Sequence, residues 1–321
     1  MTELIGNSSE IAELREEVAC LKRSDAKVLI TGESGVGKEV LAKAIHGSSA
    51  RASAKLVSLN CAGVAESLLE SELFGHAKGS FTGAYRDKQG LLELGNHGTV
   101  FLDEIGEMSL RMQALLLRFL ESGEIQPVGS VSPRHSIDVR IISATNRYLP
   151  EQVESGGFRR DLYYRLSVVT LRVPPLRERT EDLPLLAANA LRQAREAGAR
   201  ATTISEEALA VLNQYEWPGN VRELENTIAH AALYARGNVI TPDDLPAKIR
   251  KQSRPAGSEN KTQAMFKDLP SLDEMERRYV IHVLQTVGGS RTRAAEVLGI
   301  DRRTLYRMAE RFGINLKEGG E

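Results

Sequence analysis

Short apolar runs alternate with helical patterns over the first half of the chain. The runs are rich in β-branched residues and stand at residues 27–31, 55–60, 99–104, 139–145 and 167–173. Continuous apolar runs of this length are typical of strands buried on both faces of a parallel sheet. Helical patterns such as EVLAKAIHGSS and RMQALLLRFLESGE lie between them. The alternation predicts an α/β domain with a doubly wound, five-stranded parallel sheet.

The strand pattern stops after Val173 and gives way to helical patterns. Residues 181–247 are predicted to be helical, most clearly at ISEEALAVLNQYEW and VRELENTIAHAALYAR. Residues 251–263 are polar and contain Pro, Gly and Ser, which is typical of a linker. A last helical block covers 271–313. We therefore expect an α/β part, a helical part, a linker and a small all-α domain, at residues 1–173, 174–248, 249–270 and 271–321.

The composition narrows the class of protein. The chain has 321 residues, of which 41 % are hydrophobic and 26 % charged, as in a globular protein. No apolar run approaches the roughly 18 residues of a membrane span, and MTELIGNSSEIAELREE is not a secretory signal. We therefore expect a cytoplasmic protein without a membrane span. Cys20 and Cys61 give neither a disulfide framework nor a zinc spacing.

A phosphate-binding pattern follows the first predicted strand. In TGESGVGKEV, Gly32, Gly37 and Lys38 match G-x-x-x-x-G-K, in which backbone N–H groups, a helix N-terminus and a lysine meet phosphate. A plain glycine turn would also fit, but the strand before and the helix after favour a nucleotide site. The candidate binding residues are Gly32, Glu33, Ser34, Gly35, Val36, Gly37, Lys38 and Glu39. Glu39 replaces the Ser or Thr that usually binds Mg²⁺, so the ion needs another carboxylate and water.

Two carboxylates end the third predicted strand. Asp103 and Glu104 follow a buried apolar run, at the edge of the sheet where α/β proteins bind ligands. We assign Asp103 to Mg²⁺ and Glu104 to polarising the attacking water. The alternative is an acidic pair that caps the helix after it. The phosphate pattern upstream favours catalysis.

Three further sites carry polar groups that phosphate chemistry can use. Asn146 ends the fourth predicted strand, where it can orient water or the γ-phosphate, although an ordinary strand-end Asn would look the same. Arg159, Arg160 and Arg165 stand before the fifth strand as candidate charge-stabilising fingers, the alternative being surface salt bridges. Arg222 lies in the first turn of a helix, where a cation opposes the helix dipole and needs an anion nearby.

The last block, SRTRAAEVLGIDRRTLYRMAERFGI, reads as helix, turn, helix. Gly299 permits the turn and Asp301 can cap the second helix. Residues 290–311 hold six Arg but only three acidic residues, so this module is expected to bind double-stranded DNA. A three-helix packing unit with a solvated basic face is the alternative. The candidate DNA contacts are Arg302, Arg303, Thr304, Tyr306 and Arg307.

Taken together and in order, these motifs resemble the AAA+ ATPase domain of bacterial enhancer-binding proteins, the activators of sigma-54 RNA polymerase. The resemblance covers nearly the whole chain and rests on GESGVGKE, LFGHAKGSFTGA, GTVFLDEIGEM, ATNR, FRRDLYYRL, PPLRER and WPGNVREL. It implies ATP and Mg²⁺ as cofactors, a helical lid over the nucleotide and a hexameric ring. It also implies a Fis-type helix-turn-helix end that dimerises through the helix around 271–287.

The resemblance also implies roles for single residues. Asp103 and Glu104 would be the Walker B pair, Asn60 would restrain the catalytic Glu, and Asn146 would be sensor I. Arg159 and Arg165 would act in trans on a neighbour's nucleotide. Arg222 would be sensor II, and Ile5 would border the adenine.

A glycine-flanked Phe-Thr pair in GHAKGSFTGAY has no place in a strand or helix. The family carries Gly-Ala-Phe-Thr-Gly-Ala there, a loop that grips sigma-54; here Ser80 replaces the Ala. The implied contact residues are Gly79, Ser80, Phe81, Thr82, Gly83 and Ala84. An ordinary glycine-rich surface loop would poorly explain an exposed Phe.

The sequence thus predicts an ATP-driven activator that binds enhancer DNA and remodels closed complexes of the sigma-54 RNA polymerase holoenzyme. One alternative is a DNA-binding regulator of the same fold that acts without sigma-54. Another is a different AAA+ machine, such as a chaperone or replication ATPase, which would not explain GSFTGA beside a helix-turn-helix. Most family members carry a sensory domain before the ATPase. We therefore expect either control in trans or a longer natural chain.

Overall fold

The computed structural model describes residues 4–81, 83–130, 132, 137–252, 271–287 and 290–314. Thr82 and residues 253–270, which include most of the expected linker, lie outside the described residues. The chain divides into two compact units, Met1–Ser253 and Arg254–Glu321. Among the described residues, no helix combines the length and apolar character needed to cross a membrane.

Five parallel strands form the central sheet of the first unit, as predicted. Their spatial order is β2-β5-β6-β1-β7, so the chain crosses the sheet repeatedly and β1 lies inside it. Residues of β1, β5 and β6 are almost entirely buried, which explains their continuous apolar sequence. The strands are β1 (Val28–Thr31), β2 (Leu56–Asn60), β5 (Thr99–Asp103), β6 (Arg140–Thr145) and β7 (Val169–Arg172).

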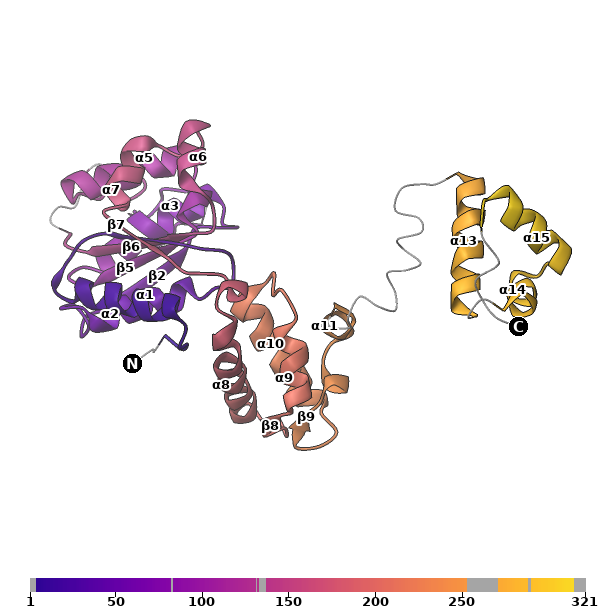
Figure 1. Ribbon diagram of the computed structural model, residues 1–321. Helices are drawn as coiled ribbons and strands as arrows, with labels where there is room; N and C mark the ends of the chain where they lie inside the picture. Colours follow the sequence, from indigo (N-terminus) through magenta and orange to yellow (C-terminus); the bar gives the residue numbers. More distant parts are fainter. Residues whose placement is uncertain are drawn as a thin grey trace. The chain divides into compact units, whose positions relative to one another are not determined.

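Helices cover both faces of this sheet (Figure 1). On one face, α1 (Ser9–Cys20) and α2 (Lys38–Ser48) pack Leu14 and Leu41 against Ile30 of β1. On the other face, α3 (Glu66–Phe74), α5 (Leu110–Ser122) and α7 (Arg160–Leu166) form a second apolar core. The periodic apolar positions of α5 point into that core, and the Ser109 side chain caps its first turn by accepting from the Met112 N–H.

Short elements connect these layers. They are η1 (Leu21–Arg23), β3 (Gly75–His76), β4 (Lys88–Gln89), α4 (Leu91–Leu94), η2 (Ile105–Glu107), α6 (Leu149–Glu154), η3 (Leu176–Glu178) and η4 (Thr180–Asp182). The antiparallel pair β3–β4 forms the base of the hairpin that carries the GSFTGA sequence. The turns η3 and η4 lead from the sheet to the helical part.

The helical part has a core of its own. It consists of α8 (Leu183–Glu196), α9 (Glu206–Asn213), α10 (Asn220–Tyr234), η5 (Pro242–Asp244) and α11 (Ala247–Gln252). Trp217 is fully buried in it and donates its indole N–H to the Leu212 carbonyl at 3.0 Å. The expectation that strands end after Val173 is wrong, because β8 (Thr203–Ile204) and β9 (Val239–Ile240) form a small parallel pair. Two-residue strands are too short to show a periodicity in sequence.

The second unit contains three described helices, α13 (Leu272–Thr286), α14 (Arg291–Leu298) and α15 (Arg302–Arg311). They enclose a small apolar core that includes Val280, Ala294 and Leu305. Gly299 ends α14 in the left-handed conformation, with φ +65°. Asp301 caps α15 as predicted, accepting the Thr304 N–H at 2.8 Å.

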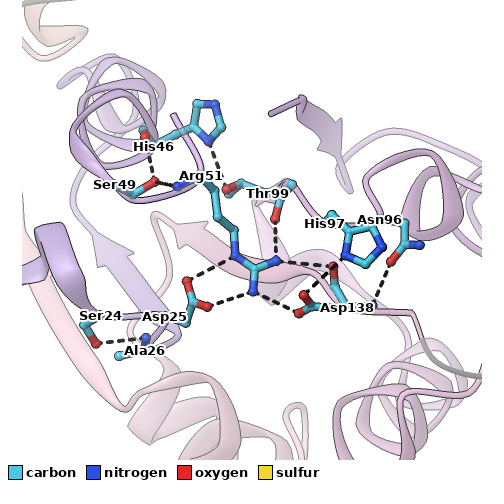
Figure 2. A network of polar contacts seen from close by, with 11 residues as sticks. Ser24, Asp25, Ala26, His46, Ser49, Arg51, Asn96, His97, Thr99 and Asp138 are labelled. Carbon is cyan, nitrogen blue, oxygen red and sulfur yellow. Dashed lines mark hydrogen bonds and ion pairs between the residues drawn. The ribbon is translucent and has the colours of Figure 1, made fainter. Parts of the chain in front are cut away.

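A polar cluster ties the loops at the amino-terminal edge of the sheet (Figure 2). The Arg51 guanidinium lies between two carboxylates, 2.7 Å from Asp25 and 2.9 Å from Asp138, and also donates to the Gly98 carbonyl. These hydrogen bonds hold the pKa of both carboxylates below their usual range. One side chain therefore joins the segments before β1, β5 and β6.

We expect Arg51→Ala to lower the free energy of unfolding by about 1–2 kcal/mol at pH 7, because a mostly buried guanidinium loses several partners. Both carboxylates have a folded pKa below the unfolded value of about 4, so this contribution is present above pH 4 and fades as the pH falls through the folded pKa. Urea unfolding at pH 7 and in acid measures it. Arg192→Ala, which removes an exposed pair with Glu196, is the matched control and should cost little. An equal loss at both pH values would contradict the ionic origin.

Candidate functional site

The phosphate-loop sequence connects β1 to α2 in a conformation that requires glycine. Gly35 and Gly37 have φ of +78° and +106°. A Cβ on Gly32 would lie 2.7 Å from the Val173 carbonyl oxygen, and one on Gly35 would lie 2.4 Å from that of Gly219. The loop is therefore tightly enclosed, and it runs straight into the amino terminus of α2, where free N–H groups favour an anion.

Lys38 begins α2 and turns its side chain back toward the sheet. The side chain is 6 % exposed, and Nζ donates to the carbonyls of Gly32 at 2.9 Å and Glu33 at 3.2 Å. It also lies 3.3 Å from Glu104 Oε1. The structure thus brings the predicted phosphate-binding lysine and the predicted catalytic carboxylate together.

Asp103 and Glu104 lie at the carboxyl end of β5, beside the ends of β6 and β1. Glu104 has φ +52°, and its second oxygen accepts the backbone N–H of Asn146 at 3.0 Å. Burial, and then the charge of Glu104, raise the pKa of the Asp103 carboxyl. Lys38 partly offsets this, but the pair remains short of positive charge. The donor set therefore fits a hard divalent cation with Asp103 as its ligand.

The described residues offer few protein ligands for a cation at this edge of the sheet. Among the described residues, no group of three or more His, Cys, Asp or Glu side chains is placed to hold a metal ion. Glu39 points elsewhere, since its carboxylate pairs with Lys43 on the exposed side of α2 at 2.7 Å. A cation at Asp103 would therefore need oxygen ligands from phosphate or water.

Asn60 and the two arginines are not brought into contact with Glu104. Asn60 stands opposite Asp103 in the β2–β5 register, and its side chain accepts the Ala62 N–H. Arg159 is exposed and forms two hydrogen bonds to Asp161, at 2.7 and 3.1 Å, while Arg165 donates to the Leu120 carbonyl. The restraint of Glu104 by Asn60 and the trans role of the arginines stay predictions.

The helical part meets the phosphate loop at the start of α10. The backbone N–H of Arg222 donates to the Gly35 carbonyl at 3.2 Å, and Ile5 packs against the core of the helical part. Sequence reasoning missed the polar residues at this junction, which are Arg177, Arg179, Asp182 and Asn220. The motifs PPLRER and WPGNVREL, which contain three of them, were the available signal.

The GSFTGA sequence forms a loop on the β3–β4 hairpin. Gly79 and Gly83 have φ of +82° and +106°, and the Gly79 N–H donates to the Ala84 carbonyl at 2.8 Å. Phe81 is 46 % exposed, and its ring meets the His76 ring edge-on at 4.9 Å. Thr82 lies outside the described residues. The hairpin thus presents an aromatic side chain to solvent, supported on one side.

A second segment supports the base of the loop. Backbone hydrogen bonds of 2.9 Å join Val128 to Gly75 and Ala77. Beyond them, Ser80 packs against Gly129, where an added Cβ would stand only 2.5 Å from the Ser80 Cβ. The Ser80 hydroxyl oxygen is buried and has no hydrogen-bond partner. Ser80, which stands where the family loop has Ala, therefore carries a buried oxygen without a hydrogen-bond partner.

We expect Ser80→Ala to stabilise the loop by up to about 1 kcal/mol, since a buried unpaired hydroxyl costs desolvation without a compensating bond. Hydrogen exchange at the Gly79 amide should become slower. Ser71→Ala is the matched contrast, because that hydroxyl lies 2.7 Å from His76 Nδ1 and its loss should speed exchange. Faster exchange in both variants would mean that the Ser80 hydroxyl contributes a bond.

The basic face of α15 is presented as expected, with one exception. Arg302, Arg303, Tyr306 and Arg307 are exposed. Thr304 is half-buried, and its hydroxyl donates to Asp301 at 3.0 Å as part of the helix cap. Four of the five predicted DNA-contact side chains are therefore open to solvent.

A parallel sheet with a glycine-rich phosphate loop, strand-end carboxylates and an attached helical part defines an AAA+ type of α/β fold. Comparisons with known proteins identify the family. The profile of the sigma-54 interaction domain matches residues 4–172, that of the AAA+ ATPase lid domain matches 177–262, and that of the Fis family of bacterial regulatory proteins matches 271–314. The chain belongs to the sigma-54-dependent transcriptional regulators.

Relatives of this family align with almost the whole chain. The transcriptional regulatory protein ZraR of Escherichia coli K12 is 46 % identical over 303 residues, which are 94 % of this chain and 67 % of ZraR. The regulatory protein AtoC of the same strain is 44 % identical over 314 residues, 97 % of this chain and 68 % of AtoC. The crystal structure of NtrX from Brucella abortus in complex with ATP has a TM-score of 0.74 and 34 % identity, covering 97 % of this chain and 70 % of NtrX.

Proposed function

We propose that the protein is an ATP-driven transcriptional activator, which binds upstream enhancer DNA and uses hydrolysis to remodel closed complexes of sigma-54 RNA polymerase in the cytoplasm. The observation that carries the proposal is the convergence of Lys38, Asp103 and Glu104 beside the phosphate loop, with Lys38 Nζ 3.3 Å from Glu104. The similarity to NtrX, whose structure was solved with ATP, supports a nucleoside triphosphate as ligand.

Each group at this edge has a part in the proposed hydrolysis. The phosphate loop and Lys38 would hold the β- and γ-phosphates, and Asp103 would hold Mg²⁺. Bound Mg²⁺ supplies positive charge to the phosphate oxygens. When a phosphate replaces Glu104 as the partner of Lys38, the Glu104 carboxylate becomes free to orient and polarise the attacking water. The hydrogen bond from the Asn146 N–H keeps that carboxylate in place.

Glu104→Gln should keep ATP binding and lose most turnover, by about a hundredfold or more, because the amide cannot polarise water. Asp103→Ala should weaken Mg²⁺-dependent binding as well as turnover. Steady-state phosphate release and binding of a fluorescent ATP analogue measure the two effects. Glu107→Gln is the control, since this neighbouring carboxylate pairs with Arg147 outside the phosphate loop. Normal turnover in Glu104→Gln would contradict the assigned role.

We also propose a closed ring in the active state, with Arg159 and Arg165 reaching the nucleotide of the neighbouring copy. Arg159, at the amino-terminal cap of α7, and Arg165, within α7, are both exposed, which is compatible with a partner in trans. The DNA-binding ends would pair through α13, where Leu272 and Tyr279 stand two turns apart and are 72 % and 50 % exposed. Paired ends would present two α15 helices to two half-sites.

Phe81→Ala should abolish promoter opening by sigma-54 holoenzyme while ATP hydrolysis and enhancer binding stay near normal, because the exposed ring is an anchor for a partner and touches no phosphate group. Open-complex formation, phosphate release and footprinting measure the three activities. Ser80→Ala in the same loop is the control and should remain active. Promoter opening by Phe81→Ala would contradict the anchor role of the ring, whereas a wild-type chain that binds enhancer DNA but opens no promoter would favour a regulator that acts without sigma-54.

A further inference from the structure

The outer edge of the phosphate loop is held by hydrogen bonds from a distant part of the chain. The carbonyl of Ser34 accepts from Asn220 Nδ2 at 3.1 Å, that of Gly35 from the Arg222 N–H at 3.2 Å, and that of Val36 from Arg179 Nη2 at 2.8 Å. The donors come from the connecting turns η3 and η4 and from the first turn of α10. Three successive loop carbonyls thus face the helical part.

This arrangement has a consequence on the inner side of the loop. In a trans peptide the C=O of one residue points opposite to the N–H of the next. Carbonyls of Ser34, Gly35 and Val36 that are fixed outward therefore turn the N–H groups of Gly35, Val36 and Gly37 inward. Those are groups that a phosphate loop offers to its anion.

Asn220 is the residue at which these contacts meet. It is fully buried, adopts φ +53°, and accepts the Leu176 N–H through Oδ1 at 2.8 Å. Its amide donates to Ser34 O and also to the Glu33 carboxylate, both at 3.1 Å. One amide therefore joins the connecting turn, α10 and the phosphate loop, in a backbone conformation that Asn tolerates better than most residues.

An ion pair on the surface strengthens the same junction. Arg177 donates twice to Glu33, at 2.9 and 2.5 Å. Arg177 and then Asn220 lower the pKa of the Glu33 carboxyl to about 2. Glu33 is therefore a charged acceptor for both donors at neutral pH.

The connecting turns also hold the amino-terminal segment of the chain. Asp182 is fully buried and accepts the Ser8 N–H at 2.8 Å and the Ser8 hydroxyl at 2.7 Å. Ser8 follows Ile5, the residue expected beside the adenine. The segment Leu176–Asp182 thus contacts both the phosphate loop and the amino-terminal segment.

We infer that Asn220 is a positioning residue for nucleotide binding, assisted by the Arg177–Glu33 pair, an inference that rests on the proposed ATPase function. By holding the loop carbonyls outward, it presets the N–H groups that meet phosphate. Asn220 is also the first residue of α10, so it links the binding of phosphate in the loop to the position of the helical part. Nucleotide binding therefore favours one setting of α10.

The test compares Asn220→Asp with the wild-type chain. The aspartate keeps the acceptor for the Leu176 N–H but loses the donor to Ser34 and repels Glu33. We expect a roughly tenfold weaker affinity for ADP and a smaller rise in melting temperature on adding ADP. Adding Glu33→Gln should restore part of the affinity, because one amide again faces one carboxylate, while the ion pair with Arg177 and the donor to Ser34 stay lost. A role confined to stability would lower the melting temperature of the ligand-free chain and leave the ADP affinity of the folded protein unchanged.

Two further variants test the inference if Asn220→Asp folds poorly. Arg177→Gln changes an exposed side chain and should weaken ADP affinity about two- to fivefold. Arg172→Gln is its matched control, since Arg172 pairs with Glu178 on the surface and should leave affinity unchanged.

The outcomes separate the two proposals. A wild-type chain that neither binds ADP nor hydrolyses ATP overturns the proposed function and this inference with it. A wild-type chain that does both, with Asn220→Asp and Arg177→Gln of unchanged affinity, overturns this inference alone. Weakened binding in both variants, with recovery on adding Glu33→Gln to Asn220→Asp, supports it.

Discussion

The parallel alignment of β1, β5 and β6 is the constraint on which the rest of the site depends. Parallel strands have their carboxyl ends at one edge of the sheet. The phosphate loop after β1, the carboxylates after β5 and Asn146 after β6 therefore lie at neighbouring positions along this edge. Lys38 then connects two of these ends through its contact with Glu104. The burial of all three strands on both faces fixes this edge firmly, because a shift of any strand would disturb two apolar cores.

The GSFTGA loop and the phosphate site are attached to the fold in different ways. The site is built on strand ends, whereas the GSFTGA loop stands on a hairpin whose two strands have only two residues each. Its base gains support from backbone bonds to Val128, in the segment that follows α5. The loop is therefore less firmly anchored than the strand ends that carry Asp103 and Glu104.

Much of this was predictable from the sequence, for identifiable physical reasons. Five apolar runs predicted the five strands, and glycine spacing predicted the phosphate loop, because both signals are local. The expected burial on both faces is right for β1, β5 and β6 and wrong for β2 and β7, which are partly exposed because they form the edges of the sheet. The contacts of Asn220 were not predictable, since it bonds Glu33 across 187 positions of sequence and no periodicity encodes such a pair. The unpaired hydroxyl of Ser80 was equally hidden, because it depends on packing against Gly129.

The contact between Ser80 and Gly129 makes the packing at two distant positions of the sequence depend on each other. Gly129 has φ +76°, and its missing Cβ is the space that Ser80 fills. Any side chain at position 129 would push the loop off the segment that supports it, and a bulkier residue at position 80 would do the same from the other side. Position 80 can therefore become smaller on its own, as in Ser80→Ala, whereas a side chain at position 129 would both strain the backbone and clash with Ser80.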